Sequence, residues 1–154
     1  MLAVRNREQM HELGAHVATH LIPGDLVVLV GELGAGKTTF VQGLGRALGV
    51  DEAITSPTFV IARAHQAARI PLVHVDAYRL GSTVELDALD LDADLATSVT
   101  VVEWGQGKVE QLADDRLIIT ITRSDDDDDV RQVGFAGVGD RWTADALDEL
   151  SAAW

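Results

Sequence analysis

Residues 31–38 read G-E-L-G-A-G-K-T, with two glycines, a lysine and a threonine at the spacing of a phosphate-binding loop. The glycines let the backbone turn successive N–H groups inward, toward phosphate oxygens. Lys37 would reach the β- and γ-phosphates, and the hydroxyl of Thr38 would hold Mg²⁺. This spacing predicts a site for a nucleoside triphosphate.

The elements that flank this loop are the ones that the chemistry needs. The apolar run 26–30 is typical of a buried strand, and a helical pattern runs from about residue 36 to residue 48 before Gly49 ends it. A helix that starts at the loop adds the positive end of its dipole to the phosphate site. A plain glycine-rich turn would account for neither the lysine nor the threonine.

Two carboxylates are candidates for work on the metal and on an attacking water. Asp76 follows the apolar run 72–75, and Glu103 follows the run 99–102. Each should emerge at the carboxyl edge of a parallel sheet, where open α/β sheets bind their ligands. Either one alone could be a solvated carboxylate at a strand end. Because there are two beside a phosphate loop, we expect at least one to serve the metal.

Two further side chains have weaker claims to the site. Thr58 follows a proline in a loop, so its hydroxyl or backbone could sense the γ-phosphate, or it could be an ordinary turn residue. Trp104 follows Glu103 and could stack near the nucleotide, face a partner or simply pack.

The overall pattern predicts one α/β domain over residues 1–154. Strand-like runs alternate with helical patterns, which favours a mainly parallel central sheet flanked by helices, as in P-loop nucleotide hydrolases. The expected elements, besides those already named, are a helix around Met10, Leu13, Val17 and Leu21, a strand at 59–64, a helix at 83–95, an antiparallel hairpin of 117–122 with 130–136, and a closing helix at 143–153.

Composition narrows the function classes. Asp and Glu number 25 against 12 Lys and Arg, and the net charge is −13, so the chain should repel nucleic-acid phosphates and suit a basic partner. No cysteine is present, which excludes a thiolate nucleophile or a disulfide framework. Apolar runs are too short for a membrane span and the start of the chain lacks a signal pattern, so a cytoplasmic protein is expected.

Three functions fit the residues themselves. The first is an ATPase; adenine is favoured because the N-K-x-D string that reads guanine is missing. The second is a small-molecule kinase, although no arginine-rich lid is apparent. The third is a nucleotide-dependent assembly factor without useful turnover, whose acidic surface would dock a basic partner.

Four motifs in order resemble one bacterial family over nearly the whole chain. They are G-E-L-G-A-G-K-T-T at 31–39, S-P-T-F at 56–59, H-V-D-A-Y-R-L at 74–80 and E-W at 103–104. Together they resemble the TsaE family, the P-loop ATPases of tRNA threonylcarbamoyladenosine biosynthesis. The resemblance implies an ATP- and Mg²⁺-dependent ATPase that acts with a TsaD-like threonylcarbamoyl transferase and a TsaB-like paralogue on adenosine 37 of tRNA. Contact of this chain with the tRNA would be secondary at most.

The resemblance also implies roles for individual residues. Lys37, Asp76 and Glu103 would be catalytic, Thr38 and Glu103 would hold Mg²⁺, and residues 56–59 would form a switch loop. Contacts to the nucleotide would come from Gly34, Ala35, Gly36, Lys37, Thr38, Thr39, Thr58, Asp76, Trp104, Glu8 and Arg131. No arginine finger is evident in the sequence, and such a residue contributes about 10³ to 10⁵ in rate. We therefore expect slow hydrolysis by the chain alone.

Overall fold

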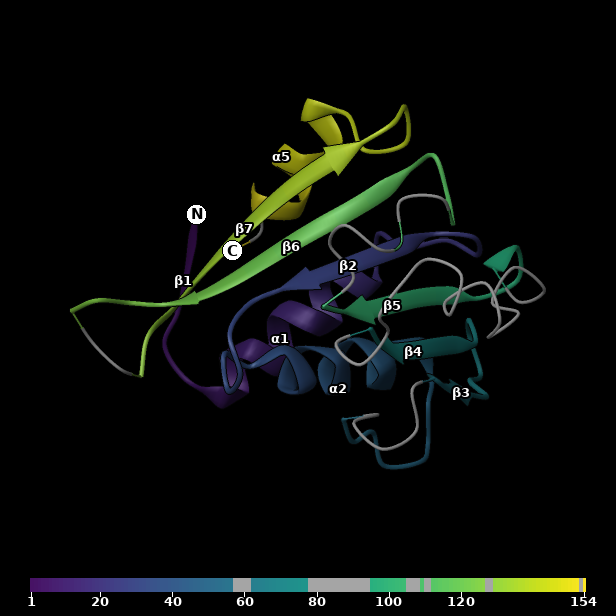
Figure 1. The fold of residues 1–154 in the computed structure, drawn as a ribbon, viewed down its shortest axis with the longest axis horizontal. Helices are drawn as coiled ribbons and strands as arrows, with labels where there is room; N and C mark the ends of the chain where they lie inside the picture. Colours follow the sequence, from purple (N-terminus) through teal and green to yellow (C-terminus); the bar gives the residue numbers. More distant parts are fainter. Residues whose placement is uncertain (57–61, 78–94, 105–108, 110–111, 127–128, 153) are drawn as a thin grey trace.

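The computed structural model describes residues 1–56, 62–77, 95–104, 109, 112–126, 129–152 and 154. Its elements, shown in Figure 1, are β1 (Leu2–Val4), α1 (Arg7–Ala18), β2 (Leu26–Val30), α2 (Lys37–Leu48), β3 (Ala62–His65), β4 (Leu72–Asp76), β5 (Val99–Glu103), β6 (Arg116–Arg123), β7 (Arg131–Val138) and α5 (Ala144–Ala152).

The strands form one mixed sheet in the order β1-β7-β6-β2-β5-β4-β3. The centre is parallel, since β2 pairs with both β5 and β6 and β4 pairs with β5. Antiparallel pairs lie toward the two edges, where β3 pairs with β4, β6 with β7, and β7 with β1. The predicted α/β class with a mainly parallel centre and an antiparallel hairpin is confirmed.

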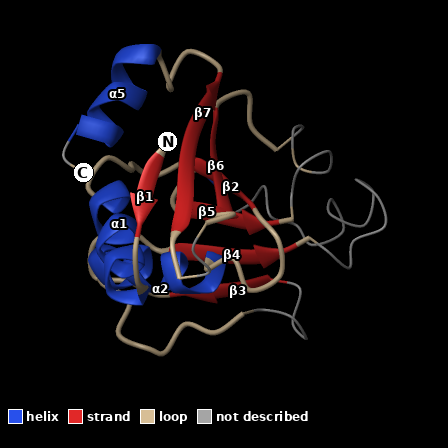
Figure 2. Cartoon of the chain, turned by 90° about the vertical axis from the view of Figure 1, so that its left-hand side faces the viewer, coloured by secondary structure: helices blue, strands red, loops and turns tan. Residues whose placement is uncertain are grey.

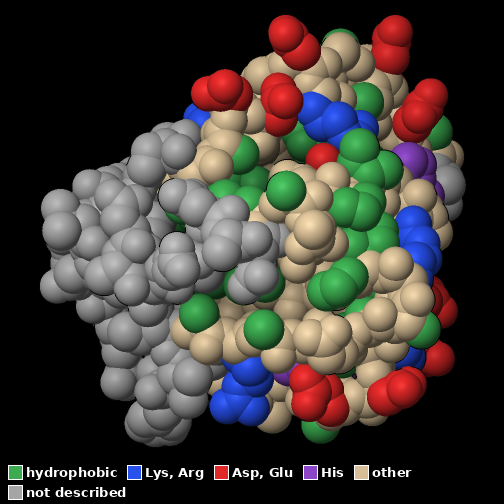
Figure 3. Space-filling model, turned by 90° about the vertical axis from the view of Figure 1, so that its right-hand side faces the viewer, with side chains coloured by type: hydrophobic (Ala, Val, Ile, Leu, Met, Phe, Trp, Pro, Cys, Tyr) green, Lys and Arg blue, Asp and Glu red, His purple; other side chains and the backbone are tan. Residues whose placement is uncertain are grey.

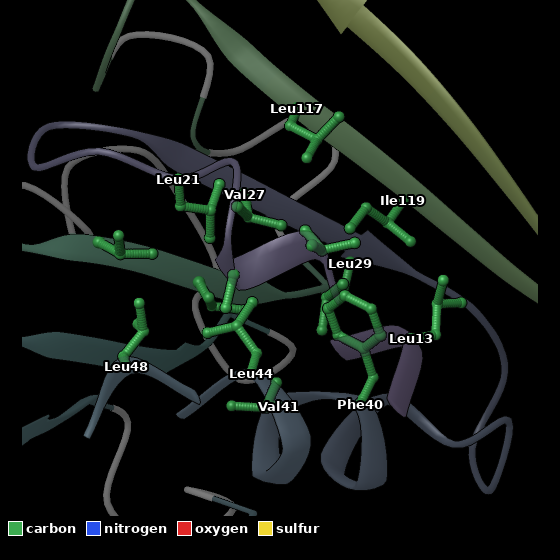
Figure 4. Packing of buried hydrophobic residues seen from close by; sticks show 14 of the residues in the cluster. Leu13, Leu21, Val27, Leu29, Phe40, Val41, Leu44, Leu48, Leu117 and Ile119 are labelled. Atoms are coloured by element: carbon green, nitrogen blue, oxygen red, sulfur yellow. The ribbon is translucent and has the colours of Figure 1, made fainter. Parts of the chain in front are cut away.

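The three helices in the described part of the chain, α1, α2 and α5, lie on one face of the sheet (Figure 2). Beneath α1 and α2 lies the larger apolar core, in which Leu13 of α1 and Phe40 and Leu44 of α2 pack over Leu29 and Ile119 of the strands (Figure 4). The apolar residues of both helices recur at three- and four-residue spacing, which is why each presents one apolar face to the sheet. The helix that begins at the phosphate loop is thereby fixed rigidly on the sheet.

The opposite face of the sheet carries a smaller apolar cluster that includes Leu26, Val28, Val75 and Val102. Successive strand residues point to opposite faces, so both faces of the central strands are apolar, as in a sheet that is covered on both sides. At the end of the molecule shown in Figure 3, acidic and basic side chains are scattered along the margin of the described surface. No helix in the described part is long and apolar enough to cross a bilayer.

Several elements differ from the sequence predictions at their boundaries. The expected strand at 59–64 is observed as β3 at Ala62–His65, and residues 57–61 lie outside the described part. In the hairpin, β6 extends one residue beyond the predicted strand at each end, whereas β7 begins one residue later than predicted and ends two residues later. The expected helix at 83–95 falls almost wholly on residues 78–94, which also lie outside the described part. The short strand β1 was not predicted.

Candidate nucleotide-binding site

The phosphate loop joins the end of β2 at Val30 to the start of α2 at Lys37. Gly34 has φ +76° and Gly36 has φ +112°, a left-handed backbone that glycine adopts without strain. Gly36 is the N-cap of α2 and makes no side-chain capping bond. The first N–H groups of a helix have no partner within it, so those of α2 remain available to an anion at this point.

Lys37 is buried beneath the loop, and its Nζ donates to the carbonyl oxygens of Gly31 at 2.7 Å and Glu32 at 2.8 Å. Burial lowers the pKa of Lys37 from its usual 10.5, and the nearby carboxylates of Glu103 and Asp76 act in the opposite direction. The ammonium group is therefore tied to the loop backbone while facing two negative charges.

Asp76 and Glu103 lie side by side at the carboxyl edge of the sheet. They are direct partners in the parallel register of β4 and β5, and Glu103 also stands opposite Leu29 of β2. Leu29 packs in the core beneath the helices, so both carboxylates point to the face that carries α2. Both are buried, with exposed fractions of 8% for Asp76 and 4% for Glu103.

Trp104 has a strained backbone at the end of β5. Its φ of 61° is the only positive value among the non-glycine residues in the described part. A bulky residue in this region costs on the order of 1–3 kcal/mol. The turn brings the indole ring within 4.3 Å, centroid to Nζ, of Lys37. The strained residue thus covers the ammonium group with an aromatic face, a favourable cation–π contact.

These groups line one cleft of about 540 Å³. Its lining residues are Leu33, Gly34, Gly36, Lys37, Thr38, Thr39, Ser56, Asp76, Glu103 and Trp104. The donor set suits Mg²⁺, which binds oxygen ligands from one or two carboxylates and completes its shell with substrate phosphates and water. Among the described residues, no three His, Cys, Asp or Glu side chains gather into a metal cage. A metal in this cleft would therefore take only a few ligands from the protein and the rest from the phosphates and water.

A second hollow of about 460 Å³ adjoins the other side of the loop. Its walls include Arg5, Asn6, Arg7, Met10, Gly34, Ala35, Gly36, Thr39, Asp129 and Arg131. Arg131 Nε donates to the carbonyl oxygen of Ala35 at 3.1 Å, which brings this residue of β7 against the loop. Glu8 lies exposed on the first turn of α1, while its neighbours Asn6 and Arg7 line the hollow. Arg131 and the start of α1 therefore border the same hollow, whereas Glu8 itself does not line it.

Two residues near the loop were not singled out from the sequence. His74 of β4 lies within an apolar run, yet its Nε2 is 2.6 Å from Oε2 of Glu103. Arg123 ends β6, and its Nη2 is 3.0 Å from the place that a Cβ on Gly34 would occupy. The sequence signal for His74 was a histidine among apolar residues, two positions before Asp76. The place of Arg123 beside the loop follows only from the parallel pairing of β6 with β2, which the sequence does not show.

The structure brings most of the expected site residues to one cleft: Gly34, Gly36, Lys37, Thr38, Thr39, Asp76, Glu103 and Trp104. Ser56 of the expected switch loop lines the same cleft. Ala35 and Arg131 line the second hollow instead. Thr58 lies outside the described residues.

Comparison with known proteins agrees with this geometry. The family model described as threonylcarbamoyl adenosine biosynthesis protein TsaE matches residues 4–133, most of the chain and all of the cleft residues named above. The chain belongs to the TsaE family. This family takes part in tRNA threonylcarbamoyladenosine biosynthesis, and the resemblance inferred from the four motifs is confirmed.

Curated TsaE proteins from several bacteria are similar to the chain. The tRNA threonylcarbamoyladenosine biosynthesis protein TsaE of Streptomyces coelicolor is 58% identical over 142 residues, which cover 88% of this chain and 96% of that protein. The TsaE protein of Bacillus subtilis is 38% identical over 138 residues, covering 89% and 85%. The crystal structure of Bacillus subtilis YdiB matches with a TM-score of 0.79 and 34% identity, over 99% of this chain and 93% of that one.

Proposed function

We propose that this TsaE-family chain is a Mg²⁺-dependent ATPase that supports tRNA threonylcarbamoyladenosine formation. The observation that carries the proposal is the single cleft in which the N-terminus of α2 and the ammonium group of Lys37 face the paired carboxylates of Asp76 and Glu103. A triphosphate needs fixed positive groups for its oxygens, and its magnesium needs oxygen ligands. Membership of the TsaE family supports a role for this chemistry in tRNA threonylcarbamoyladenosine biosynthesis.

Each side chain has a defined part in this proposal. The N–H groups of residues 34–39 bind the phosphates, and Lys37 exchanges its bonds to Gly31 and Glu32 for the β- and γ-phosphate oxygens. Thr38 and Glu103 would hold Mg²⁺, which would supply positive charge to the phosphate oxygens. Asp76 orients the water that attacks the γ-phosphorus, and Trp104 shields Lys37 from bulk solvent.

Hydrolysis by the chain alone should be slow, with partners that resemble TsaD and TsaB supplying the acceleration or gating. The acidic character of the chain suits protein partners with basic surfaces better than direct contact with tRNA. An assembly factor that uses ATP occupancy without useful turnover is the second candidate. It is favoured by the position of Ser56, through which the loop that begins there could respond to a bound nucleotide.

Multiple-turnover tRNA modification with the purified partner proteins tests the proposal. We expect sustained modification with the wild-type chain and ATP, and none with Lys37→Ala, because the triphosphate then loses its fixed ammonium group. A non-hydrolysable ATP analogue separates the two candidates. If the analogue supports repeated turnover as well as ATP does, the assembly factor is correct and the ATPase proposal is not.

A further inference from the structure

His74 is fully buried on β4 and has no part in the proposed contacts with nucleotide or metal. Its Nε2 lies 2.6 Å from Oε2 of Glu103, which is 5% exposed at its side chain. Its other ring nitrogen, Nδ1, has no hydrogen-bond partner among the described residues. Burying a polar ring without a hydrogen bond is costly, so the contact with Glu103 is what stabilises this buried imidazole.

The strand register explains how the two side chains meet. His74 stands opposite Val101 in the parallel pairing of β4 and β5, and Glu103 is two residues further along β5. The two residues are therefore diagonal neighbours on the same face of the sheet, within reach of long side chains. A carboxylate only accepts hydrogen bonds, so the Nε2–H of His74 donates. This bond engages Oε2 of Glu103, and the same carboxylate lines the cleft.

We propose that His74 is a positioning residue that holds the Glu103 carboxylate in the orientation needed to bind the magnesium of the bound nucleotide. The inference rests on the proposed function and extends it to this residue. Asp76 is the direct neighbour of Glu103, and like charges side by side repel, so an untethered Glu103 would turn away from the shared edge. The bond from His74 opposes that movement before any metal arrives. Partners of this kind usually change metal affinity about 10- to 100-fold.

The same chain contains a matched control. His65 is also buried, and its Nδ1 is 2.6 Å from Oε1 of Glu52. The Glu52 side chain is 60% exposed and borders a different hollow, one walled by residues such as Arg46 and Ile54. The two pairs share their chemistry and bond length, and only the pair of His74 and Glu103 faces the phosphate loop. A substitution that removes the ring of His65 therefore reports the structural cost of losing a buried histidine's bond to a carboxylate away from the phosphate loop.

The test compares His74→Asn and His74→Gln with His65→Leu, which has no hydrogen-bond donor, in the full chain. The amide nitrogen of glutamine stands about where Nε2 stands in histidine, whereas asparagine is too short to reach the Glu103 oxygen. Two affinities are measured for each protein: that of a fluorescent ATP analogue in EDTA, and that of Mn²⁺, by its EPR signal, for the protein loaded with a non-hydrolysable analogue. Thermal unfolding of each ligand-free protein gives the change in stability.

We expect His74→Asn to weaken Mn²⁺ binding by about 10- to 100-fold while nucleotide binding in EDTA stays near the wild-type value. His74→Gln should recover most of the Mn²⁺ affinity, and His65→Leu should change only the unfolding temperature. Wild-type Mn²⁺ affinity in His74→Asn, or equal loss in the asparagine and glutamine variants, would overturn the inference. A wild-type chain that binds the ATP analogue neither in EDTA nor in Mg²⁺ would instead overturn the proposed function, and the inference with it.

Discussion

The helix that carries the phosphate loop is held against α1 by an unusually close approach at Gly43. A Cβ atom added at Gly43 would overlap the carbonyl oxygen of His11, and it would lie 2.6 Å from the Cα and 2.7 Å from the carbonyl carbon of that residue. All three neighbours are backbone atoms of α1, so no side chain can rotate away to make room. The substitution Gly43→Ala must therefore push the two helices apart.

The size of the effect follows from this geometry. Carbon atoms in ordinary contact lie about 3.5–4.0 Å apart, so α1 and α2 must separate by roughly 1 Å at this point. Overpacking of a core costs about 1–3 kcal/mol, and contact with a rigid backbone places this case at the upper end. Alanine regains about 1 kcal/mol through its higher helix propensity. We expect a net loss of about 2 kcal/mol, which lowers Tm by roughly 4–8 °C in a chain of this size.

Gly45→Ala is the matched control on the same helix. A Cβ at Gly45 would meet the flexible end of the Ile54 side chain and lie 3.2 Å from Cδ2 of Leu72, rather than a backbone. These side-chain ends can move, and the propensity gain of about 1 kcal/mol offsets much of the remaining cost. Thermal and urea unfolding of the ligand-free proteins give both values. If Gly43→Ala proves as stable as Gly45→Ala, the reasoning from backbone contact is wrong.

Three further predictions concern the cleft. Burial lowers the pKa of Lys37 in the folded chain below its usual 10.5, so the unfolded chain binds more protons than the folded chain between the folded and unfolded pKa values. The free energy of unfolding should therefore rise with pH between those values. Urea unfolding at several pH values should show this rise in the wild type and not in Lys37→Met. Glu103→Ala should reduce ATP turnover far more than nucleotide affinity; equal losses in single-turnover and binding assays would contradict its role at the metal. Arg123→Ala should weaken binding of the ATP analogue about fivefold at low salt, with Arg116→Ala at the other end of β6 as an unaffected control.

The sequence was informative about the site because its signals are local. The loop pattern fixes the order strand, glycine turn and helix, and β2 and α2 are observed where that order predicts them. Asp76 and Glu103 each follow a short apolar run, and the rule that parallel strands present their carboxyl ends at one edge was enough to expect them together. The structure brings them together, while their roles at the metal remain predictions.

What the sequence did not reveal depends on contacts between distant segments. From the sequence alone, His74 is simply one residue of a buried strand. Only the register of β4 against β5 shows that it lies diagonally beside Glu103. The position of Arg123 depends on β6 continuing past the end of its pairing with β2 at Val30, which carries its guanidinium alongside the loop. The strand β1 has only three residues, and its pairing with β7 stabilises it rather than any pattern of its own.

The net charge of the chain did not predict the electrostatic potential at the site, because that potential also depends on residues from distant segments. The chain carries −13 overall, yet five of its 12 basic residues gather at one end, where they surround the phosphate loop: Arg5, Arg7, Lys37, Arg123 and Arg131. At physiological salt, exposed charges are largely screened beyond about 8 Å. A bound triphosphate would therefore respond mainly to these cations, to the start of α2 and to the carboxylates of Asp76, Glu103 and Asp129 beside them. An acidic chain can in this way repel a polynucleotide over most of its surface and still bind a nucleotide tightly at one edge.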